Sequence, residues 1–388
     1  MTSLYLQQFR RSLVFVLFFC LISWTGVPQA RAQEATTAAP QLSLNQAVQQ
    51  SLEINEAVRK AGKEIDRTKV LRKNAADNVT YEPTGLVYDA VQGANWASLL
   101  ASDLSWRMSS KSLTMEQDTV ALDTCQKYWA VLADQEALND AQVSLDTTQV
   151  QLQKARAAYQ AGLLIQGGQA GLLAAETQAA AAHAAVNSAQ NDLTSAYTTL
   201  NQAVGLEPGD RPVLTDEIAM APLQVDNLDT EVHRVLDGAP SIWLADQNVD
   251  LQKQLANLLS YTGQYQPYDA GQISVDQAKL DAAGARKAFD LATRGLYYNA
   301  KDLEEKYATV QQQVYMNEES LRVVKAEFEV GIVTAADVAA AEKNLADAKS
   351  NLATIASNHA YLKLAFEKPW AVSSASSSSS GSTATSSS

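Results

Sequence analysis

A seven-residue spacing of apolar and small side chains dominates the middle of the chain and limits what it can fold into. One row holds Leu172, Ala179, Val186, Leu193 and Leu200, and a second holds Ala175, Ala182, Ala189, Ala196 and Ala203. The two rows are offset by three residues, so together they form the a/d seam of a coiled coil. Because the second row is all alanine, the helix axes can approach more closely than the usual separation of about 8–10 Å.

The same spacing recurs along most of the chain, for example at Val275, Ala282, Phe289, Leu296 and Leu303. It predicts six helices, near residues 42–77, 106–161, 169–203, 226–259, 273–330 and 335–367. The fifth would contain 58 residues and would be roughly 87 Å long at 1.5 Å per residue. Such a helix needs packing partners along its length. We therefore expect a mainly α fold of long antiparallel coiled-coil helices.

The two ends of the chain differ in composition from the body. Residues 1–32 contain Arg10 and Arg11, then the apolar run SLVFVLFFCLISWTGV and the small-x-small site ARA, which is the pattern of a secretory signal peptide. A membrane anchor is the alternative, but the run is shorter than the about 20 residues of a spanning helix. The serine-rich residues 370–388 predict a disordered tail.

The net charge, the cysteine count and the spacing of the histidines disfavour several classes of function. Without residues 1–32 the chain has 27 basic and 43 acidic residues, a net charge of −16, which disfavours nucleic acid as a partner. Only Cys125 remains, so no internal disulfide is expected. His183, His233 and His359 lack metal-ligand spacing, and His359 falls on a seam row. Motifs of nucleotide-binding and hydrolytic enzymes are missing from the sequence. We expect no enzymatic activity, cofactor or metal.

The chain repeats itself at an offset of 184 residues. At this offset Leu44, Val48, Leu52, Val58 and Ala61 meet Leu228, Val232, Leu236, Ile242 and Ala245. Further on, YQAG at 159–162 aligns with FEVG at 328–331, and AAETQ at 174–178 aligns with AAEKN at 340–344. We therefore expect two tandem helical repeats, at 33–204 and 226–369. Residues 205–225, which contain proline and glycine, would form the linker.

The glycine of the aligned tetrapeptide lies, in both repeats, where one heptad pattern ends and another begins. We predict a helical-hairpin turn there, with Gly331 in the left-handed position just past the helix end. Thr334 is then placed to cap the next helix. Asp337, three residues later, would lie at the positive N-terminus of that helix.

The ordered set of helix, long helix, aromatic-x-x-glycine turn and Ala/Leu-rich helix, present twice, resembles the TolC-like outer-membrane efflux proteins over about residues 42–367. Its most specific stretches are FEVGIVTAADVAAAEKNLADAKSNL and the two openings, LSLNQAVQQSLEINEAV and VDNLDTEVHRVLDGAPSI. The resemblance implies a homotrimeric helical tunnel with a strand barrel in the outer membrane. It also implies a passive channel that docks through its hairpin tips to a periplasmic adaptor and works with an inner-membrane pump.

The resemblance also assigns functional positions. It places the adaptor contacts at the hairpin tips, at Tyr159, Gly162, Phe328, Gly331, Ile332, Val333 and Thr334. In the family, acidic side chains at the tip narrow the channel, and Asp337 matches one such position as a candidate constriction. The neighbouring candidate, residue 340, is alanine. A charge that stabilises the helix N-terminus is the other explanation for Asp337.

The segments that would supply membrane strands depart from the family. A spanning hairpin needs more than about 20 residues, because each strand needs about 9–11. In the first segment only NVTYEPTGLVYDAV is strand-like, and Pro83 and Gly85 interrupt it. The second, SYTGQYQPYDAGQI, has 14 residues. We therefore expect short or vestigial β-hairpins. An exported coiled-coil scaffold or binding protein, which kept the helical body without spanning the membrane, is the alternative function.

Aromatic residues gather at these two segments. The first carries Tyr81, Tyr88, Trp96 and Trp106, and the second carries Tyr261, Tyr265 and Tyr268. An aromatic belt at a membrane surface is one explanation. Packing of aromatic side chains at the ends of the loops is the other.

Overall fold

The structure is a computed structural model, and it describes residues 40–81, 90–161, 168–218, 220–260 and 265–372. The predicted signal peptide, Gly162 and nearly all of the predicted serine-rich tail lie outside these residues. The described elements are β1 (Gln41–Leu42), α1 (Leu44–Ile54), α2 (Glu56–Asp77), α3 (Ala90–Gln160), α4 (Gly168–Val204), β2 (Val213–Leu214), α5 (Leu228–Gly238), α6 (Pro240–Ser260), α7 (Tyr265–Glu329) and α8 (Ala335–Glu367).

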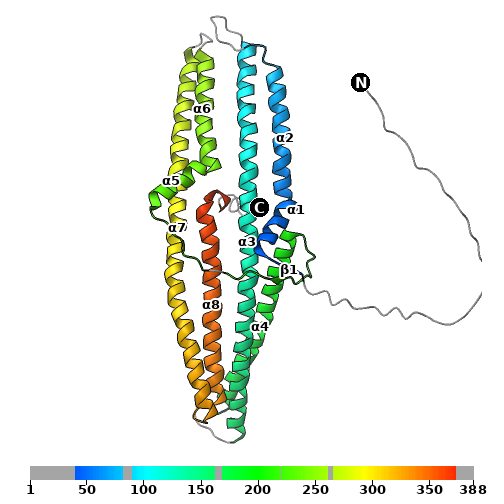
Figure 1. Cartoon of the computed structure of the whole chain (residues 1–388), viewed down its shortest axis with the longest axis vertical. Helices are drawn as coiled ribbons and strands as arrows, with labels where there is room; N and C mark the ends of the chain where they lie inside the picture. The colour runs from blue at the N-terminus through cyan, green and yellow to red at the C-terminus, as the bar shows by residue number, and fades with distance from the viewer. Residues whose placement is uncertain (1–39, 82–89, 162–167, 219, 261–264, 373–388) are drawn as a thin grey trace, which may run out of the picture. The chain divides into compact units, whose positions relative to one another are not determined.

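The helices occur as two equivalent sets, which confirms the mainly α fold and the internal duplication. The first set, α1 to α4, has 11, 22, 71 and 37 residues, and the second, α5 to α8, has 11, 21, 65 and 33. In Figure 1, α2 and α6 lie beside the upper parts of α3 and α7, and α4 and α8 lie beside their lower parts. Each long helix is therefore covered by two shorter helices in succession.

Two of the predicted helices, 42–77 and 226–259, are wrong as single helices because each is broken near its first third. Asn55 interrupts the first, and its side-chain oxygen accepts hydrogen bonds from the amides of Ala57 and Val58 at 2.9 and 3.2 Å. This asparagine caps α2, which favours a new helix start over continuation. Pro240 begins α6, where its missing N–H costs no hydrogen bond.

The long helices begin earlier than the heptad pattern predicted. Helix α3 starts at Ala90, not at residue 106, and α7 starts at Tyr265, not at residue 273. Helix therefore occupies the second of the two segments considered for β-hairpins from Tyr265 onward, but only the last two residues of the strand-like stretch in the first. Residues 82–89 and 261–264 lie outside the described residues. Within the described part of the chain the strands are β1 and β2, a parallel pair with Gln41 opposite Val213 and Leu42 opposite Leu214. The linker thus pairs with the segment preceding α1.

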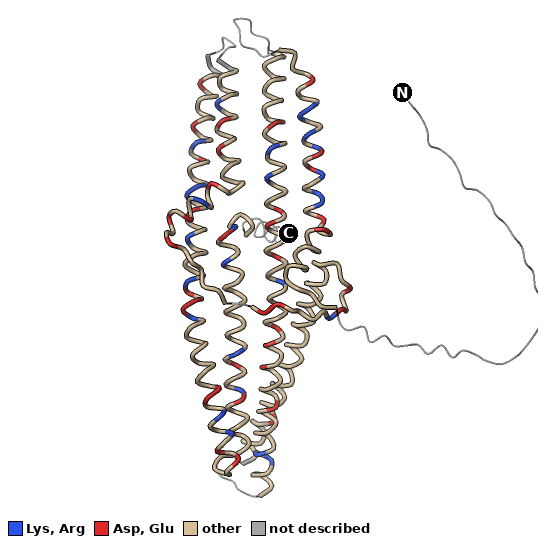
Figure 2. The backbone as a smooth tube through the Cα atoms, viewed as in Figure 1, with Lys and Arg blue, Asp and Glu red and all other residues tan. Residues whose placement is uncertain are grey.

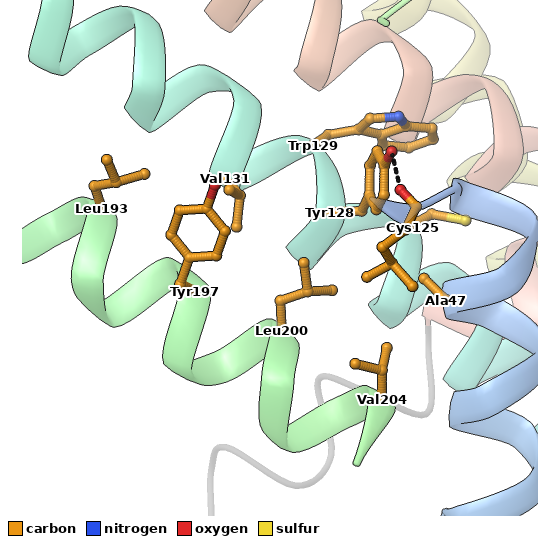
Figure 3. Close-up of a cluster of buried hydrophobic side chains, with 10 residues drawn as sticks. Ala47, Cys125, Tyr128, Trp129, Val131, Leu193, Tyr197, Leu200 and Val204 are labelled. Atoms are coloured by element: carbon orange, nitrogen blue, oxygen red, sulfur yellow. Dashed lines mark hydrogen bonds between the residues drawn. The ribbon is translucent and has the colours of Figure 1, made fainter. Parts of the chain in front are cut away.

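The first repeat has its core around Tyr128, which is fully buried where α1, α3 and α4 meet (Figure 3). The Tyr128 hydroxyl donates to the Leu42 carbonyl oxygen at 3.0 Å and accepts from the Asp216 amide at 3.1 Å. Leu200 and Tyr197 of α4 pack beside it. This core therefore fastens β1 and the linker to the long helix α3.

The second repeat is closed by residues at the end of α8 and just after it. Phe366 is buried against Leu223 and Ala300, and Trp370 packs against the α5 cluster that contains Val232 and Leu236. Lys368 and the Trp370 indole N–H both bind the Asp118 carboxylate of α3, at 2.5 and 2.9 Å. The packed chain thus reaches residue 372, within the segment 370–388 that composition assigned to the tail.

Candidate functional site

The turn between α7 and α8 is built as the sequence predicted. Gly331 has a φ of +78°, the left-handed region that glycine tolerates best. The amide of Ile332 donates to the Glu327 carbonyl oxygen at 2.9 Å, and the Gly331 amide donates to Phe328 at 3.0 Å. These two bonds are those of a Schellman motif, which satisfies the last carbonyl groups of a helix. Gly331 therefore ends α7 and turns the chain towards α8.

The start of α8 is fixed by Thr334 and Asp337. The Asp337 carboxylate accepts from the Thr334 amide at 2.8 Å and from its hydroxyl at 2.7 Å. These bonds from Thr334 lower the pKa of Asp337, with a smaller contribution from the charge of Lys154 on α3. Asp337 therefore serves as the N-terminal charge of α8, and it is also exposed at the hairpin tip.

Large apolar side chains are exposed at this tip. Phe328, Val330 and Ile332 retain 46, 71 and 73% of their accessible surface, whereas Val333 is half-buried. At the other tip, Tyr159 near the end of α3 retains 47%. Gly162 lies outside the described residues. An apolar tip that its own chain leaves uncovered is suited to contact another protein.

Both tips lie at the same end of the helices (Figure 1, bottom). The Thr147 hydroxyl of α3 donates to the Ala339 carbonyl oxygen of α8 at 2.9 Å, which ties the two hairpins together near this end. Within the hairpins, Arg156 pairs with Glu176 at 3.3 Å and Lys325 pairs with Glu342 at 2.9 Å. The structure therefore brings the predicted tip residues Tyr159, Phe328 and Gly331 to one end of the chain.

The contact between α3 and α8 contains an acidic pair that the heptad pattern did not reveal. Asp140 of α3 lies beside Asp347 of α8, and Lys343 binds both Asp347 oxygens at 2.5 and 2.7 Å. Burial raises the pKa of Asp140 to about 6, and the hydrogen bond to Asp347 and its charge act in the same direction.

A second polar group lies where the linker crosses α7 and α8. Glu304 accepts from the Leu223 amide at 2.6 Å and from Lys301 at 2.8 Å, and its other neighbour is His359 at 3.3 Å. Although burial opposes ionisation of Glu304, these donors outweigh it and lower the pKa of Glu304. His359 is 1% exposed, so it is a packed seam residue, as its heptad position predicted. This group holds the linker against the second repeat.

One side of α7 carries several large apolar side chains that the described part of the chain does not cover, interspersed with the exposed residues Lys287, Asp302 and Glu305. Ile273, Leu280, Leu291, Tyr298 and Met316 are exposed along it, at spacings that place them on one side of the helix. Gly284 and Gly295 lie on the same side, and a Cβ added at either would have no neighbour within 4 Å. A helix-interior glycine costs about 1 kcal/mol relative to alanine, and no contact within the described chain accounts for these two.

Figure 2 shows acidic and basic residues interspersed along the described helices. In the described part of the chain, no cluster of three or more His, Cys, Asp or Glu side chains is arranged to hold a metal ion. None of the described helices combines the length and the apolar character that crossing a membrane requires. At the end opposite the tips, Trp106 packs under the Arg72 guanidinium at 5.1 Å, whereas Tyr81 is exposed.

Neither a known family's sequence profile nor any curated protein sequence matches the chain. Solved structures do match it. The outer membrane protein VceC of Vibrio cholerae superimposes with a TM-score of 0.62 at 13% identity, over 83% of this chain and 94% of VceC. The CmeC outer membrane channel of Campylobacter jejuni gives 0.64 at 12% identity, over 84% of this chain and 85% of CmeC.

The open state of the MtrE outer membrane channel of Neisseria gonorrhoeae also matches, with a TM-score of 0.53 and 14% identity over 84% of this chain. These likenesses extend over both repeats and nearly the whole length of the matched proteins. Sequence identity is too low for them to carry more than the fold. The chain therefore has the fold of outer membrane channels, which is the fold that the TolC-like sequence pattern predicts.

Proposed function

We propose that this chain is the passive channel component of a cell-envelope export system. Three copies would form a helical tunnel at the outer membrane, and the hairpin tips would dock to a periplasmic adaptor. An inner-membrane pump would supply the energy, and the channel would select cargo by the size and charge of its bore. The observation that carries the proposal is the match to outer membrane channels over 83–84% of this chain.

The outer face of α7 supports assembly into a ring. Several exposed apolar side chains beside two glycines are costly to leave in water, and a helix of a second copy would cover them. The partner surface would lie elsewhere on the same chain, which generates a closed ring when the rotation between copies closes. A homotrimer is the ring that the channel fold implies.

Conductance and assembly test the proposal together. Mature protein added to a planar lipid bilayer should produce discrete single-channel currents, and its mass in detergent should be that of a trimer. Replacing both Gly284 and Gly295 with leucine should convert the trimer to monomers with unchanged helix content. Gly93→Leu on α3 is the matched control, since that glycine also has open space around it. A wild-type protein that stays monomeric at all concentrations would contradict the proposal.

The exposed tip supports docking to an adaptor. Ile332 and Val330 are among the most exposed large apolar side chains of the described chain, and their positions agree with the tips at which the family resemblance places adaptor contacts. Ile332→Asp should abolish crosslinking between this chain and its adaptor in cells while leaving the purified protein folded. Val70→Asp, at an exposed apolar position on α2 far from the tip, should leave crosslinking intact. Gly331→Val should weaken both docking and tip folding, because valine disfavours the left-handed backbone.

Asp337 is proposed as a constriction residue as well as a helix charge. The exposed position of its carboxylate at the tip supports the first role, and its bonds to Thr334 account for the second. In bilayers, Asp337→Asn should reduce the preference for cations over anions if the carboxylate faces the bore. An unchanged ion preference, with a weakened α8 start, would leave only the helix role.

An exported coiled-coil scaffold or binding protein is the second candidate. The early starts of α3 at Ala90 and α7 at Tyr265 favour it, because helix replaces sequence that membrane strands would need. Extraction of membranes separates the two candidates. Release by salt alone, or a one-to-one complex with another envelope protein, would support the second candidate. A heat-modifiable trimer that requires detergent would support the channel.

A further inference from the structure

The acidic pair between α3 and α8 has an unsatisfied atom at its centre. Asp140 Oδ1 is buried and has no hydrogen-bond donor among the described residues. Its neighbour Asp347 already accepts two bonds from Lys343, so that lysine is committed to the other carboxylate. An ionised carboxylate can only accept hydrogen bonds, and a buried acceptor without a donor is destabilising. The arrangement is therefore incomplete while both acids are ionised.

A single proton supplies the hydrogen bond that the two ionised carboxylates lack. When Asp140 is protonated, its hydroxyl can donate to Asp347, so the repulsion between two carboxylates becomes a hydrogen bond. The pair is confined to this contact. The equivalent positions in the other repeat, by the alignments of the two tips, are Thr309 on α7 and Ala181 on α4. Neither of these residues is acidic, so the duplicated sequence does not repeat the pair.

The pair joins a helix of the first repeat to a helix of the second. Asp140 is on the long helix of the first repeat, and Asp347 is on the helix that forms a hairpin with α7. Nearer the tip the same two helices are joined by the bond from Thr147 to Ala339. We propose that Asp140 and Asp347 form a proton-operated latch that holds the α7–α8 hairpin against α3 when one proton is shared, and loosens this contact when the proton leaves.

The direction of the pH dependence follows from the pKa of Asp140, which burial and Asp347 raise to about 6 against an opposing effect of Lys343. A raised pKa means that the closed contact binds the proton more tightly than the separated helices do. The latch is fully stabilised below the ordinary pKa of about 4 and is lost as the pH rises through about 6. One proton changes the ratio of closed to open contact by at most about tenfold per pH unit in this range.

Other charged groups near the latch act in the same direction or are already paired. On α3, Glu136 is exposed one turn before Asp140. Between α3 and α4, burial raises the pKa of Asp134, with a contribution from the charge of Asp192. On the α7 side of α8, Lys349 pairs with Glu318 at 3.2 Å. The additional acids favour proton binding, so they do not reverse the sign.

Distance measurement between α3 and α8 tests the latch without any transport assay. Spin labels would be placed at the exposed positions Asn139 and Asn351 of full-length mature protein, diluted with unlabelled protein. In the wild type, the longer-distance population should increase between pH 4.5 and 7 and stay constant above that. Asp140→Asn should remain in the short-distance population at every pH, because the amide donates to Asp347 without a titrating proton.

Two further variants complete the experiment. Asp347→Asn should move the pH step to lower pH, since the second carboxylate is gone while Asp140 remains buried. Asp146→Asn makes the same change at an exposed acid of α3 away from the contact, and it should keep the wild-type step. A pH step that survives in Asp140→Asn, or a wild type without a step, would overturn the proposal.

The latch would act as a gate only if the proposed channel function holds, and the two can fail separately. A pH-dependent distance in a protein that conducts no current would keep the latch and reject the channel. A conducting trimer with the same α3–α8 distance at pH 4.5 and 7.5 would reject the latch and keep the channel.

Discussion

The helices α4 and α8 are the same element of the repeat in two different settings. Each is the shorter partner of a long helix, and they contain 37 and 33 residues. The first packs along α3 and reaches α1, whereas α8 packs along α7 and also along α3. Much of α4 is consequently exposed, whereas α8 is enclosed by two long helices. Duplicated sequence therefore does not imply duplicated surroundings.

The polar contacts at aligned positions of the two repeats differ in the same way. In the first repeat the Gln135 amide donates to the Tyr197 hydroxyl at 2.7 Å. The aligned position in the second repeat is Glu304, which faces His359 and the linker instead. Charged or ionisable groups are thus placed where α8 has two neighbours. A charge there needs partners that only the enclosed setting can supply.

The largest effect is expected from truncating the same seam position in both settings. Phe366 and Leu200 are aligned, fully buried residues of α8 and α4. Phe366→Ala should lower the free energy of unfolding by about 4 kcal/mol and Leu200→Ala by about 3 kcal/mol, because each leaves a cavity. Urea unfolding followed by circular dichroism measures both. An effect below 1 kcal/mol at Phe366 would contradict the enclosed setting of α8.

The contacts of Lys368 and Trp370, which follow α8, should contribute somewhat less to the free energy of unfolding. Trp370→Ala removes its packing against α5 and its bond to Asp118, and it should cost about 3 kcal/mol, at the low end for tryptophan truncation. Asp118→Asn keeps an acceptor for the indole but weakens the pair with Lys368, which should cost about 1 kcal/mol. Equal losses in the two variants would show that the ion pair, not the packing, dominates. The same unfolding assay applies.

Two left-handed glycines provide a closely matched pair. Gly205 after α4 and Gly331 after α7 have φ values of +79° and +78°. Alanine at Gly331 should cost about 1 kcal/mol through backbone strain alone, since its Cβ would meet nothing within 4 Å. Alanine at Gly205 should cost a few tenths of a kcal/mol more, because its Cβ would lie 2.9 Å from Ile54 Cδ1, which must shift. Reversal of this order in urea unfolding would show that the second tip is more constrained than its contacts indicate.

The smallest effect is expected at Asp337. Its lowered pKa means that its contribution to the start of α8 is present above the unfolded pKa of about 4 and is lost as the pH falls through its lower folded pKa. Amide exchange in the first turn of α8 should therefore accelerate, after correction for intrinsic rates, in acid for the wild type. Asp337→Asn should show faster exchange at neutral pH and no acid step. An identical response in both proteins would contradict the role as helix charge.

Local signals in the sequence were sufficient to predict several elements of the structure. The range 335–367 was predicted for the last helix and is observed as α8, because its heptad rows coincide with a capping residue, Thr334, and a clear end. Gly331 was predicted in the left-handed position and adopts it. Asn55 was missed because apolar periodicity continues on both sides of it, and only the cap shows that the helix restarts. The early starts of α3 and α7 were missed because their first turns lack a strong heptad row.

The sequence by itself determined the helical class, the duplication and the glycine turn, since these depend on spacing and on backbone preferences within short segments. The tertiary structure decided which helices are neighbours. It placed α8 rather than α4 between two long helices, paired the linker strand with β1, and brought Asp140 beside Asp347 across more than two hundred residues of chain. Contacts of this kind depend on how whole elements pack, and a seven-residue pattern specifies a seam without specifying its partner.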